Sequence, residues 1–270
     1  MLAEGVHFTH HCPPHDVGWK LAAVNLSDLA AMGARPLGML LGLGVGHGRD
    51  ARWAAEVARG VAEAAVRFSA PMLGGDTVRL PGAPVLGLTA LGHVPAGEAL
   101  GRAGARPGDD LWVSGTIGDA GLGLQAALGR RAPDRRLLKR YRRPVPRLAL
   151  GQALRGVATA LIDVSDGLLL DASRLADASG VRAVLVEDAI PLSDAARAAG
   201  VPPAELAALG DDYELLFAAP PGLRAQVEEA GRRAGVPVTR IGRCEAGEGL
   251  ALVDGPGAPR PLPPSPGYRH

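Results

Sequence analysis

Apolar and polar residues alternate along the chain with two different periods. Apolar residues that recur every three or four positions are typical of amphipathic helices, and short apolar runs bounded by glycine or proline are typical of buried strands. Helices are predicted at 16–32, 50–69, 118–129, 147–155, 166–179, 203–209 and 221–235. Strands are predicted at 36–45, 71–75, 83–94, 111–115, 159–165, 182–187, 213–219 and 238–244. The alternation predicts a mixed α/β protein with a loop-like tail at 254–270.

The predicted element ends carry residues that suit them. Asp16 and Asp50 are expected to cap the first two helices, because aspartate accepts hydrogen bonds from unpaired backbone N–H groups. Gly33 is expected to end the first helix, because glycine readily adopts a left-handed conformation. A cluster of glycine, proline and aspartate at 104–110 predicts a linker, so we expect a domain boundary near Gly104.

Length, composition and charge narrow the class of protein. The 270 residues suffice for an N-terminal α/β domain at 1–104 and a C-terminal α/β domain at 105–270. Hydrophobic residues make up 47% of the chain but aromatics only 3%, so alanine, valine and leucine must build the core. A net charge of +1 argues against a nucleic-acid partner, and no apolar run suits a membrane helix. Two distant cysteines without a signal peptide predict a cytoplasmic location.

One segment, HFTHHCPPH at 7–15, concentrates four histidines and a cysteine in nine positions. His7 and His11 have a spacing that zinc ligands use on helices. However, Pro13 and Pro14 prevent one helix from carrying the run, and no second cluster of cysteine and histidine follows. A solvated loop that contributes one histidine to binding is therefore favoured over a zinc site.

Two aspartates stand in apolar or glycine-rich surroundings in the N-terminal half. Asp28 lies in a predicted helix that is otherwise apolar or small, with Asn25 one turn earlier on the same face. A buried carboxylate is costly unless it is paired or binds a cation, although Asp28 could also lie at the exposed edge of the helix. Asp76 follows a short predicted strand and two glycines, which let a backbone approach a phosphate closely, but ordinary turns look the same.

Two further acidic clusters mark strand ends in the C-terminal half. The strand at 159–165 ends at Asp163, Ser165 and Asp166, where a helix opens, and such strand ends hold ligands in α/β folds. Asp166 as a simple helix cap is the alternative. Asp211 and Asp212 precede another strand, where an ordinary acidic turn is equally possible.

Four acidic clusters at element ends together indicate hard cations. Carboxylate oxygens favour magnesium, which usually accompanies phosphates, so the pattern suits a nucleotide-dependent phosphoryl transfer. The chain has neither the P-loop motif nor the protein-kinase motifs. The residues alone therefore predict magnesium and phosphate on a fold that is not of the P-loop class.

Six stretches, in this order, resemble thiamine-monophosphate kinases. They are EGVHF at 4–8, DVGWKLAAVNLSDLAAMGARP at 16–36, LGGDTVR at 73–79, GRAGARPGDDLWVSGTIGDAGLGL at 101–124, IDVSDGLLLDASRLA at 162–176 and GDDYELLF at 210–217. The resemblance implies the two-domain fold of aminoimidazole ribonucleotide synthetase, with an N-terminal domain that dimerises through its sheet. It also implies direct, Mg²⁺-assisted transfer of the ATP γ-phosphoryl group to thiamine monophosphate, giving thiamine diphosphate.

The resemblance assigns roles to residues that match the family's motifs. The implied magnesium ligands are Asp28, Asp76, Asp163 and Asp166. The implied ATP contacts are Gly75, Asp76, Arg102 and Ser165. The implied contacts to thiamine monophosphate are His7, Asp211 or Asp212, and Tyr268.

The chain also departs from the family pattern. Relatives have an earlier segment with a Gly-Asp-Asp stretch, an acidic metal ligand just before the position of Met1, and an aromatic residue near Arg59 or Gly60. Their absence predicts that the gene begins upstream of Met1, and that the chain as given is a dimer that binds nucleotide but turns over weakly. A non-catalytic homologue that binds nucleotide or thiamine phosphate is the alternative.

Overall fold

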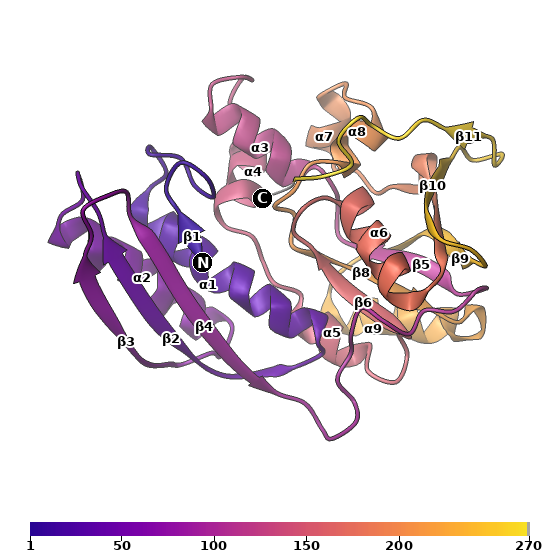
Figure 1. Ribbon diagram of the computed structural model, residues 1–270, viewed down its shortest axis with the longest axis horizontal. Coiled ribbons are helices and arrows are strands. Elements are labelled where there is room, and N and C mark those ends of the chain that lie inside the picture. Colours follow the sequence, from indigo (N-terminus) through magenta and orange to yellow (C-terminus); the bar gives the residue numbers. More distant parts are fainter. Residues whose placement is uncertain (269–270) are drawn as a thin grey trace.

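The computed structural model describes residues 1–268 and contains two β-sheets with one long helix between them (Figure 1). Residues 2–93 build a four-stranded sheet, and residues 110–260 build a seven-stranded sheet. The structure confirms the predicted mixed α/β class.

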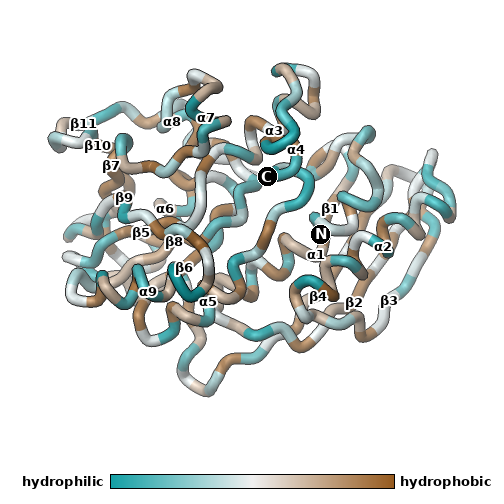
Figure 2. The backbone as a smooth tube through the Cα atoms, turned by 180° about the vertical axis from the view of Figure 1, so that it is seen from behind, coloured by the Kyte–Doolittle hydropathy of each residue, from teal (hydrophilic) through white to brown (hydrophobic). Residues whose placement is uncertain are grey.

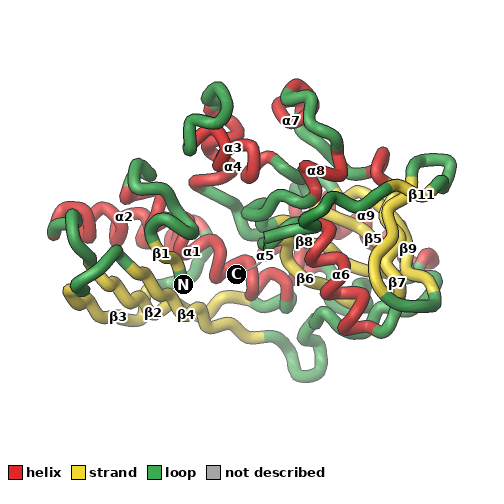
Figure 3. The backbone as a smooth tube through the Cα atoms, turned by 45° about the horizontal axis from the view of Figure 1, so that its top comes forward, coloured by secondary structure: helices red, strands yellow, loops and turns green. Residues whose placement is uncertain are grey.

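The smaller sheet is covered by helices on one face. Its unit comprises β1 (Leu2–Ala3), α1 (Pro14–Ala31), β2 (Arg35–Val45), α2 (Ala51–Arg67), β3 (Met72–Arg79) and β4 (Val85–His93). The strand order is β1-β4-β2-β3, with β2 parallel to β3 and the other neighbours antiparallel. Within the described residues, α1 and α2 lie on one face and no helix covers the other (Figure 3).

The larger sheet carries the rest of the chain. Its unit comprises β5 (Asp110–Ser114), α3 (Asp119–Ala127), α4 (Arg135–Arg142), α5 (Leu148–Ala153), β6 (Ala160–Val164), α6 (Leu168–Ser179), β7 (Arg182–Val186), α7 (Asp194–Ala198), α8 (Pro203–Ala207), β8 (Glu214–Ala219), α9 (Arg224–Ala234), β9 (Val238–Glu245), β10 (Gly249–Val253) and β11 (Pro259–Arg260). The strand order is β11-β10-β7-β9-β5-β8-β6, antiparallel except between β7 and β10. Every residue of β5, β6 and β8 is buried, and hydrophobic residues gather along β5 and β8 (Figure 2).

The sequence pattern located most elements but not all of their ends. Asp50 caps α2 as predicted, because its side chain accepts a hydrogen bond from the Trp53 N–H at 2.8 Å. Asp16 as a cap is wrong, because α1 already begins at Pro14, a residue that suits the first turn of a helix. Gly33 adopts a φ of 65° directly after the helix, as expected.

Among the described residues, five α-helices and strands were not predicted from the pattern, and the two-residue strand β1 is one of them. The helix α4 is rich in arginine and buries only Leu137 and Tyr141, so its apolar stripe is too thin to detect. The helix α7 is a single short turn. The tail expected to be a loop contains β11, which pairs with β10, and β10 in turn pairs with β7 just before the tail begins.

Close packing places α1 between the two sheets. Gly18 and Gly60 let α1 and α2 cross closely, since a Cβ at Gly18 would lie 1.9 Å from the Val57 carbonyl oxygen. Gly151 lets α5 pack closely against α1 in the same way, since a Cβ at Gly151 would lie 2.0 Å from the Ala30 carbonyl oxygen. The carboxyl-terminal half of α1 is therefore held against β6 and β8, where the larger sheet carries its acidic strand ends.

Candidate active site

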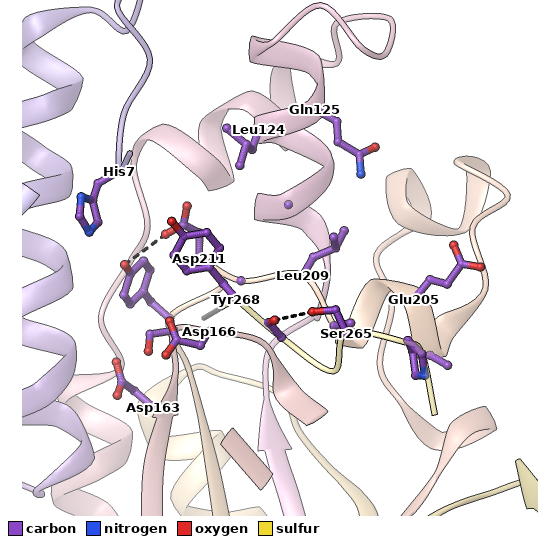
Figure 4. A pocket seen from close by; sticks show the side chains of 18 of the residues that line it. His7, Leu124, Gln125, Asp163, Asp166, Glu205, Leu209, Asp211, Ser265 and Tyr268 are labelled. Carbon is purple, nitrogen blue, oxygen red and sulfur yellow. Dashed lines mark hydrogen bonds between the residues drawn. The ribbon is translucent and has the colours of Figure 1, made fainter. Parts of the chain in front are cut away.

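A cavity of ≈ 1320 Å³ opens between α1 and the larger sheet (Figure 4). Its walls come from the first seven residues, α1, α3, the turn after β6, the segment around α8 that leads into β8, and the tail. Its lining carboxylates are Asp28, Asp163, Asp166, Glu187, Glu205 and Asp211. The arginines that line it are Arg130 and Arg260. The excess of carboxylates makes the cavity suited to cations.

The turn between β6 and α6 is shaped by a buried carboxylate that the sequence reasoning missed. Asp171 accepts hydrogen bonds from the backbone N–H groups of Ser165 at 3.1 Å and Asp166 at 3.0 Å. Arg174 joins Asp171 at 2.7 Å to Asp166 at 2.5 Å. These bonds fix the turn, with Ser165 and Asp166 at the cavity wall. The spacing of Asp171 behind Asp166 was the available signal.

Gly167 is required at the start of α6. It adopts a φ of 120°, and a Cβ there would lie 3.0 Å from the Ala208 carbonyl carbon. Gly167 is also the N-cap, so Asp166 does not cap the helix and the alternative of a simple capping role is excluded.

Asp28 and Asp163 form an acidic pair between α1 and β6. Burial, and after it the charge of Asp28, raise the pKa of Asp163 to about 7, although a hydrogen bond from the Ser27 hydroxyl at 2.7 Å opposes the shift. Asp28 lines the cavity and is exposed, which agrees with the alternative of an exposed helix edge rather than a buried side chain. Partial burial still raises its pKa, while the charges of the Met1 amino group and of Arg102 lower it. A bound cation would stabilise the ionised forms of these two neighbouring carboxylates, whose negative charges otherwise repel each other.

The segment before β8 contributes Asp211 through an unusual backbone. Asp211 and Tyr213 both have positive φ angles, 74° and 50°, which non-glycine residues rarely adopt. The Asp211 carboxylate accepts a hydrogen bond from the Tyr213 hydroxyl at 3.2 Å and an ion pair from Lys20 at 2.9 Å. It lies in the middle of the cavity wall, beside Tyr268 (Figure 4).

Asp212 has a different environment from its neighbour. It is buried, and its carboxylate accepts the backbone N–H groups of Gly118 at 2.6 Å and Ala120 at 3.2 Å. Burial raises the pKa of Asp212 to about 7, and Arg140 opposes the shift. Asp212 does not line the cavity, and its contacts hold the start of α3.

The two chain ends reach the cavity together. The His7 ring nitrogen Nδ1 accepts a hydrogen bond from the Ala3 N–H at 3.1 Å, which orients the imidazole at one side. Tyr268 is half exposed and is held by a hydrogen bond from its backbone N–H to the Asp166 carbonyl oxygen at 2.8 Å. Both line the cavity, together with Ser165.

The remaining predicted residues lie outside the cavity lining. Arg102 lies close enough to Asp28 to affect its pKa. Gly75 and Asp76 lie within β3, so the expectation that Asp76 follows the strand is wrong. A Cβ on Gly75 would lie 2.2 Å from the Leu41 carbonyl oxygen, so close strand packing already requires glycine there.

The histidine-rich segment contains buried anchors rather than a metal centre. Phe8 and Cys12 are buried, and burial raises the pKa of the Cys12 thiol to about 11, which disfavours a metal-binding thiolate. Among its four histidines, His10 and His11 are the exposed ones, and His10 also pairs with Glu4. Across residues 1–268, no group of three or more His, Cys, Asp or Glu side chains is arranged to hold a metal unaided.

Two family models match the chain on either side of Gly104. The model for the N-terminal domain of AIR synthase related protein matches residues 1–94, and the model for its C-terminal domain matches residues 106–255. The fold and the acidic cavity between the two units therefore define the class as AIR synthase related proteins.

Individual relatives are more specific. The thiamine-monophosphate kinase of Caulobacter vibrioides is 43% identical over 258 residues, covering 93% of this chain and 73% of that protein. The crystal structure of thiamine-monophosphate kinase from Stenotrophomonas maltophilia K279a has a TM-score of 0.84 at 38% identity, covering 96% of this chain and 84% of that one. The structure of AaThiL complexed with AMPPCP and TMP has a TM-score of 0.85 at 31% identity, covering 100% of this chain and 84% of that one. The chain belongs to the thiamine-monophosphate kinase family, which confirms the resemblance.

Proposed function

We propose that the protein catalyses the ATP-dependent phosphorylation of thiamine monophosphate to thiamine diphosphate. The observation that carries the proposal is one cavity whose wall holds Asp28, Asp163 and Asp166 at one side and His7, Asp211 and Tyr268 beside them. Kinases among the relatives, and a structural neighbour complexed with AMPPCP and TMP, support the same reaction. No observation favours the non-catalytic alternative.

The acidic side of the cavity suits magnesium. Its donors are hard carboxylate oxygens, and the raised pKa of Asp163 reflects a buried negative charge without enough local compensation. Magnesium bound there would neutralise charge on the transferring phosphoryl group. Since no three acidic, histidine or cysteine side chains among the described residues form a ready-made cage, phosphate oxygens and water would complete the coordination of ions held by Asp28, Asp163 and Asp166.

The other side suits a cationic aromatic ligand. The thiazolium ring of thiamine carries a positive charge, which an aromatic face and a carboxylate both attract. Tyr268 offers the aromatic ring, Asp211 offers the carboxylate, and His7 lies across from them. We assign substrate contact to Asp211 rather than Asp212, because Asp212 is occupied with the start of α3. Ser165, between the two sides, is assigned to the nucleotide.

We further propose a homodimer that forms through the open face of the smaller sheet. The register of β2 and β3 pairs Leu40 with Gly74, Gly42 with Asp76 and Gly44 with Val78, so Asp76 and Val78 share a face with Leu40. The inner face carries Met39 and Leu43 against α1.

Large apolar side chains on this smaller sheet remain exposed, namely Leu37, Leu40, Met72, Leu73, Val78 and Leu91. Several exposed apolar side chains on one small sheet favour an interaction site there.

The dimer also bears on the proposed roles of β3. Asp76 and Gly75 lie on the edge strand opposite β1, and β1 is the strand of this sheet that touches the cavity. Three strand spacings separate those edges, or roughly 14 Å. We infer that Asp76 acts as a magnesium ligand, and Gly75 with Arg102 as nucleotide contacts, within the assembled dimer.

The remaining assignments concern location and partners. No helix in residues 1–268 is long and apolar enough to cross a membrane. ATP and magnesium are cytoplasmic reactants, and Cys12 and Cys244 are free thiols, so we propose a cytoplasmic location. The small net charge supports the absence of a nucleic-acid partner.

Turnover with defined substrates tests the proposed function. Thiamine diphosphate formation from thiamine monophosphate and Mg²⁺–ATP is measured for the wild-type protein, Asp28→Asn and the control Asp194→Asn, whose side chain is 94% exposed. We expect magnesium-dependent product from the wild type and the control, and almost none from Asp28→Asn. ATP binding without any product from the wild type would favour the non-catalytic alternative.

A further inference from the structure

Lys20 on α1 is buried, with 1% of its surface exposed. Lysine is almost never fully buried unless it is paired. Its ammonium group donates to Asp211 Oδ2 at 2.9 Å and to the His7 carbonyl oxygen at 3.2 Å. It also lies 4.0 Å from the centroid of the Tyr141 ring. The three directions in which an ammonium group can donate therefore each have a partner.

Lys20 does not line the cavity, but two of its partners do. His7 belongs to the first loop of the chain, whereas Asp211 precedes β8 in the other unit. One ammonium group thus joins the two segments that carry the proposed substrate contacts. Because Lys20 belongs to α1, which packs between the two sheets, the position of this group is fixed by the fold.

The segment that carries Asp211 needs such an anchor. Its positive φ angles at Asp211 and Tyr213 are unfavourable and persist only where surrounding contacts hold them. The backbone is held by bonds from Asp211 N–H to the Ser165 carbonyl oxygen and from Tyr213 N–H to the Val164 carbonyl oxygen, both 2.8 Å. The Asp211 carboxylate is held by Lys20 at one oxygen and by the Tyr213 hydroxyl at the other.

We propose that Lys20 is a positioning residue for thiamine monophosphate, which sets the direction of the Asp211 carboxylate and the place of the His7 segment. The proposal rests on the proposed function, because it gives Asp211 and His7 their substrate. It predicts a selective effect: loss of Lys20 weakens the use of thiamine monophosphate, while nucleotide use at Asp28, Asp163 and Ser165 is kept.

A purely structural role for Lys20 gives a different expectation. Methionine has a similar length and no charge, and replacing one member of a buried pair usually destabilises the fold. Asp211 keeps 25% of its side chain exposed, so water can solvate its carboxylate when Lys20 is replaced. We therefore expect Lys20→Met to fold, and any stability loss must be separated from the effect on substrate use.

The experiment compares Lys20→Met, Lys20→Arg and the matched control Arg224→Met. Arg224 pairs with the buried Asp110 at 2.6 Å on a surface that does not line the cavity. In Lys20→Met we expect the KM for thiamine monophosphate to rise at least ~10-fold, because small misplacements of a contact group cost this much or more. The KM for ATP should stay within about twofold, as for an interaction that only one substrate uses. Lys20→Arg keeps the charge and should recover part of the loss.

A second readout does not depend on turnover. Hydrogen exchange at the Asp211 and Tyr213 amides should be at least ~10-fold faster in Lys20→Met, because local opening becomes easier, while the β5 amides stay as in the wild type. A wild type that makes no thiamine diphosphate would refute the proposed function but leave this exchange test in force. Unchanged exchange at both amides, equal KM increases for both substrates, or the same KM change in Arg224→Met would each overturn the positioning role.

Discussion

Two acidic regions of this molecule differ in how much of a site one chain can build. Between α1 and β6, one chain brings together Asp28, Asp163 and Asp166, although more than a hundred residues separate the first from the others. On β3, Asp76 stands on an uncovered sheet face, at the edge opposite the strand that touches the cavity. Both regions look alike in sequence, as aspartates near glycines at apparent element ends.

The difference follows from what packs against each region. The turn after β6 is shaped by Asp171, which accepts hydrogen bonds from its backbone, and Ser27 on α1 donates to Asp163 just before the turn. No described helix or strand covers the outer face of β3 (Figure 3). Its exposed side chains are therefore available to contact a second subunit. The site between α1 and β6 is built within one chain, so a single substitution of one of its aspartates should abolish activity. The role proposed for β3 depends on the dimer, so activity there should be lost when the dimer dissociates.

The largest effect is expected at Asp163. Asp163→Asn should lower thiamine diphosphate formation by about 10²–10³-fold, the usual loss when charge stabilisation of a transition state is removed. The metal-free variant should also melt at a higher temperature, because Asn replaces a buried, poorly compensated carboxylate. Initial rates and thermal melting measure both effects. Asp177→Asn on the exposed side of α6 is the control, and equal activity of both variants would remove Asp163 from the site.

The β3 side should fail through assembly. Val78→Asp places a carboxylate on the open face, and in a two-fold interface like charges should weaken the dimer by about two orders of magnitude or more. Light scattering should show a monomer with reduced turnover, while Val66→Asp, at an exposed site on α2, should stay dimeric and active. A wild-type monomer with full activity would contradict the proposed dimer, and with it the role given to Asp76.

A smaller effect is expected at the second layer of the β6 turn. Asp171→Asn keeps the shape of the side chain but replaces one carboxylate oxygen by an NH₂ group, which cannot accept hydrogen bonds. Arg174 or the two backbone N–H groups that now donate to Asp171 would then lose their acceptor. Leaving such buried donors without acceptors costs about 1–3 kcal/mol. Urea unfolding should show this loss together with a higher KM for ATP, since Ser165 is displaced. An unchanged unfolding free energy would show that the turn is held by other contacts.

The smallest effect concerns the pH dependence of stability at Asp212. Its folded-state pKa of about 7 lies above its ordinary value of 3.8, so the folded form holds its proton to a higher pH. Stability from this group is complete below pH 4 and is lost as pH rises towards 7. Asp212→Asn mimics the protonated form. Between pH 5 and 7.5, the unfolding free energy of the variant, measured with urea, should therefore fall less than that of the wild type, by on the order of 1 kcal/mol. If the unfolding free energy of the variant fell more steeply with pH than that of the wild type, the raised pKa of Asp212 would be contradicted.

The sequence predicted what local patterns determine and missed what tertiary contacts determine. The helix α2 and the buried strand β6 were evident, because a cap and a continuous apolar run lie within a few residues. That Asp28, Asp163 and Asp166 lie around one cavity required the resemblance, since periodicity gives no long-range order.

The opposite environments of two adjacent aspartates were not predictable from pattern. Asp211 and Asp212 are distinguished by positive φ angles and by the position of α3, which only the fold supplies. Lys20 was overlooked for the same reason, because a lysine in an amphipathic helix normally lies on the solvated face.

Cations are proposed to bind between α1 and the turn after β6. Anomalous scattering from Mn²⁺ in crystals grown with thiamine monophosphate and a non-hydrolysable ATP analogue would locate them. We expect manganese within about 2.2 Å of carboxylate oxygens from at least two of Asp28, Asp163 and Asp166, with the ligand phosphates completing the coordination. Manganese that binds the nucleotide while lying away from all three aspartates would contradict this proposal.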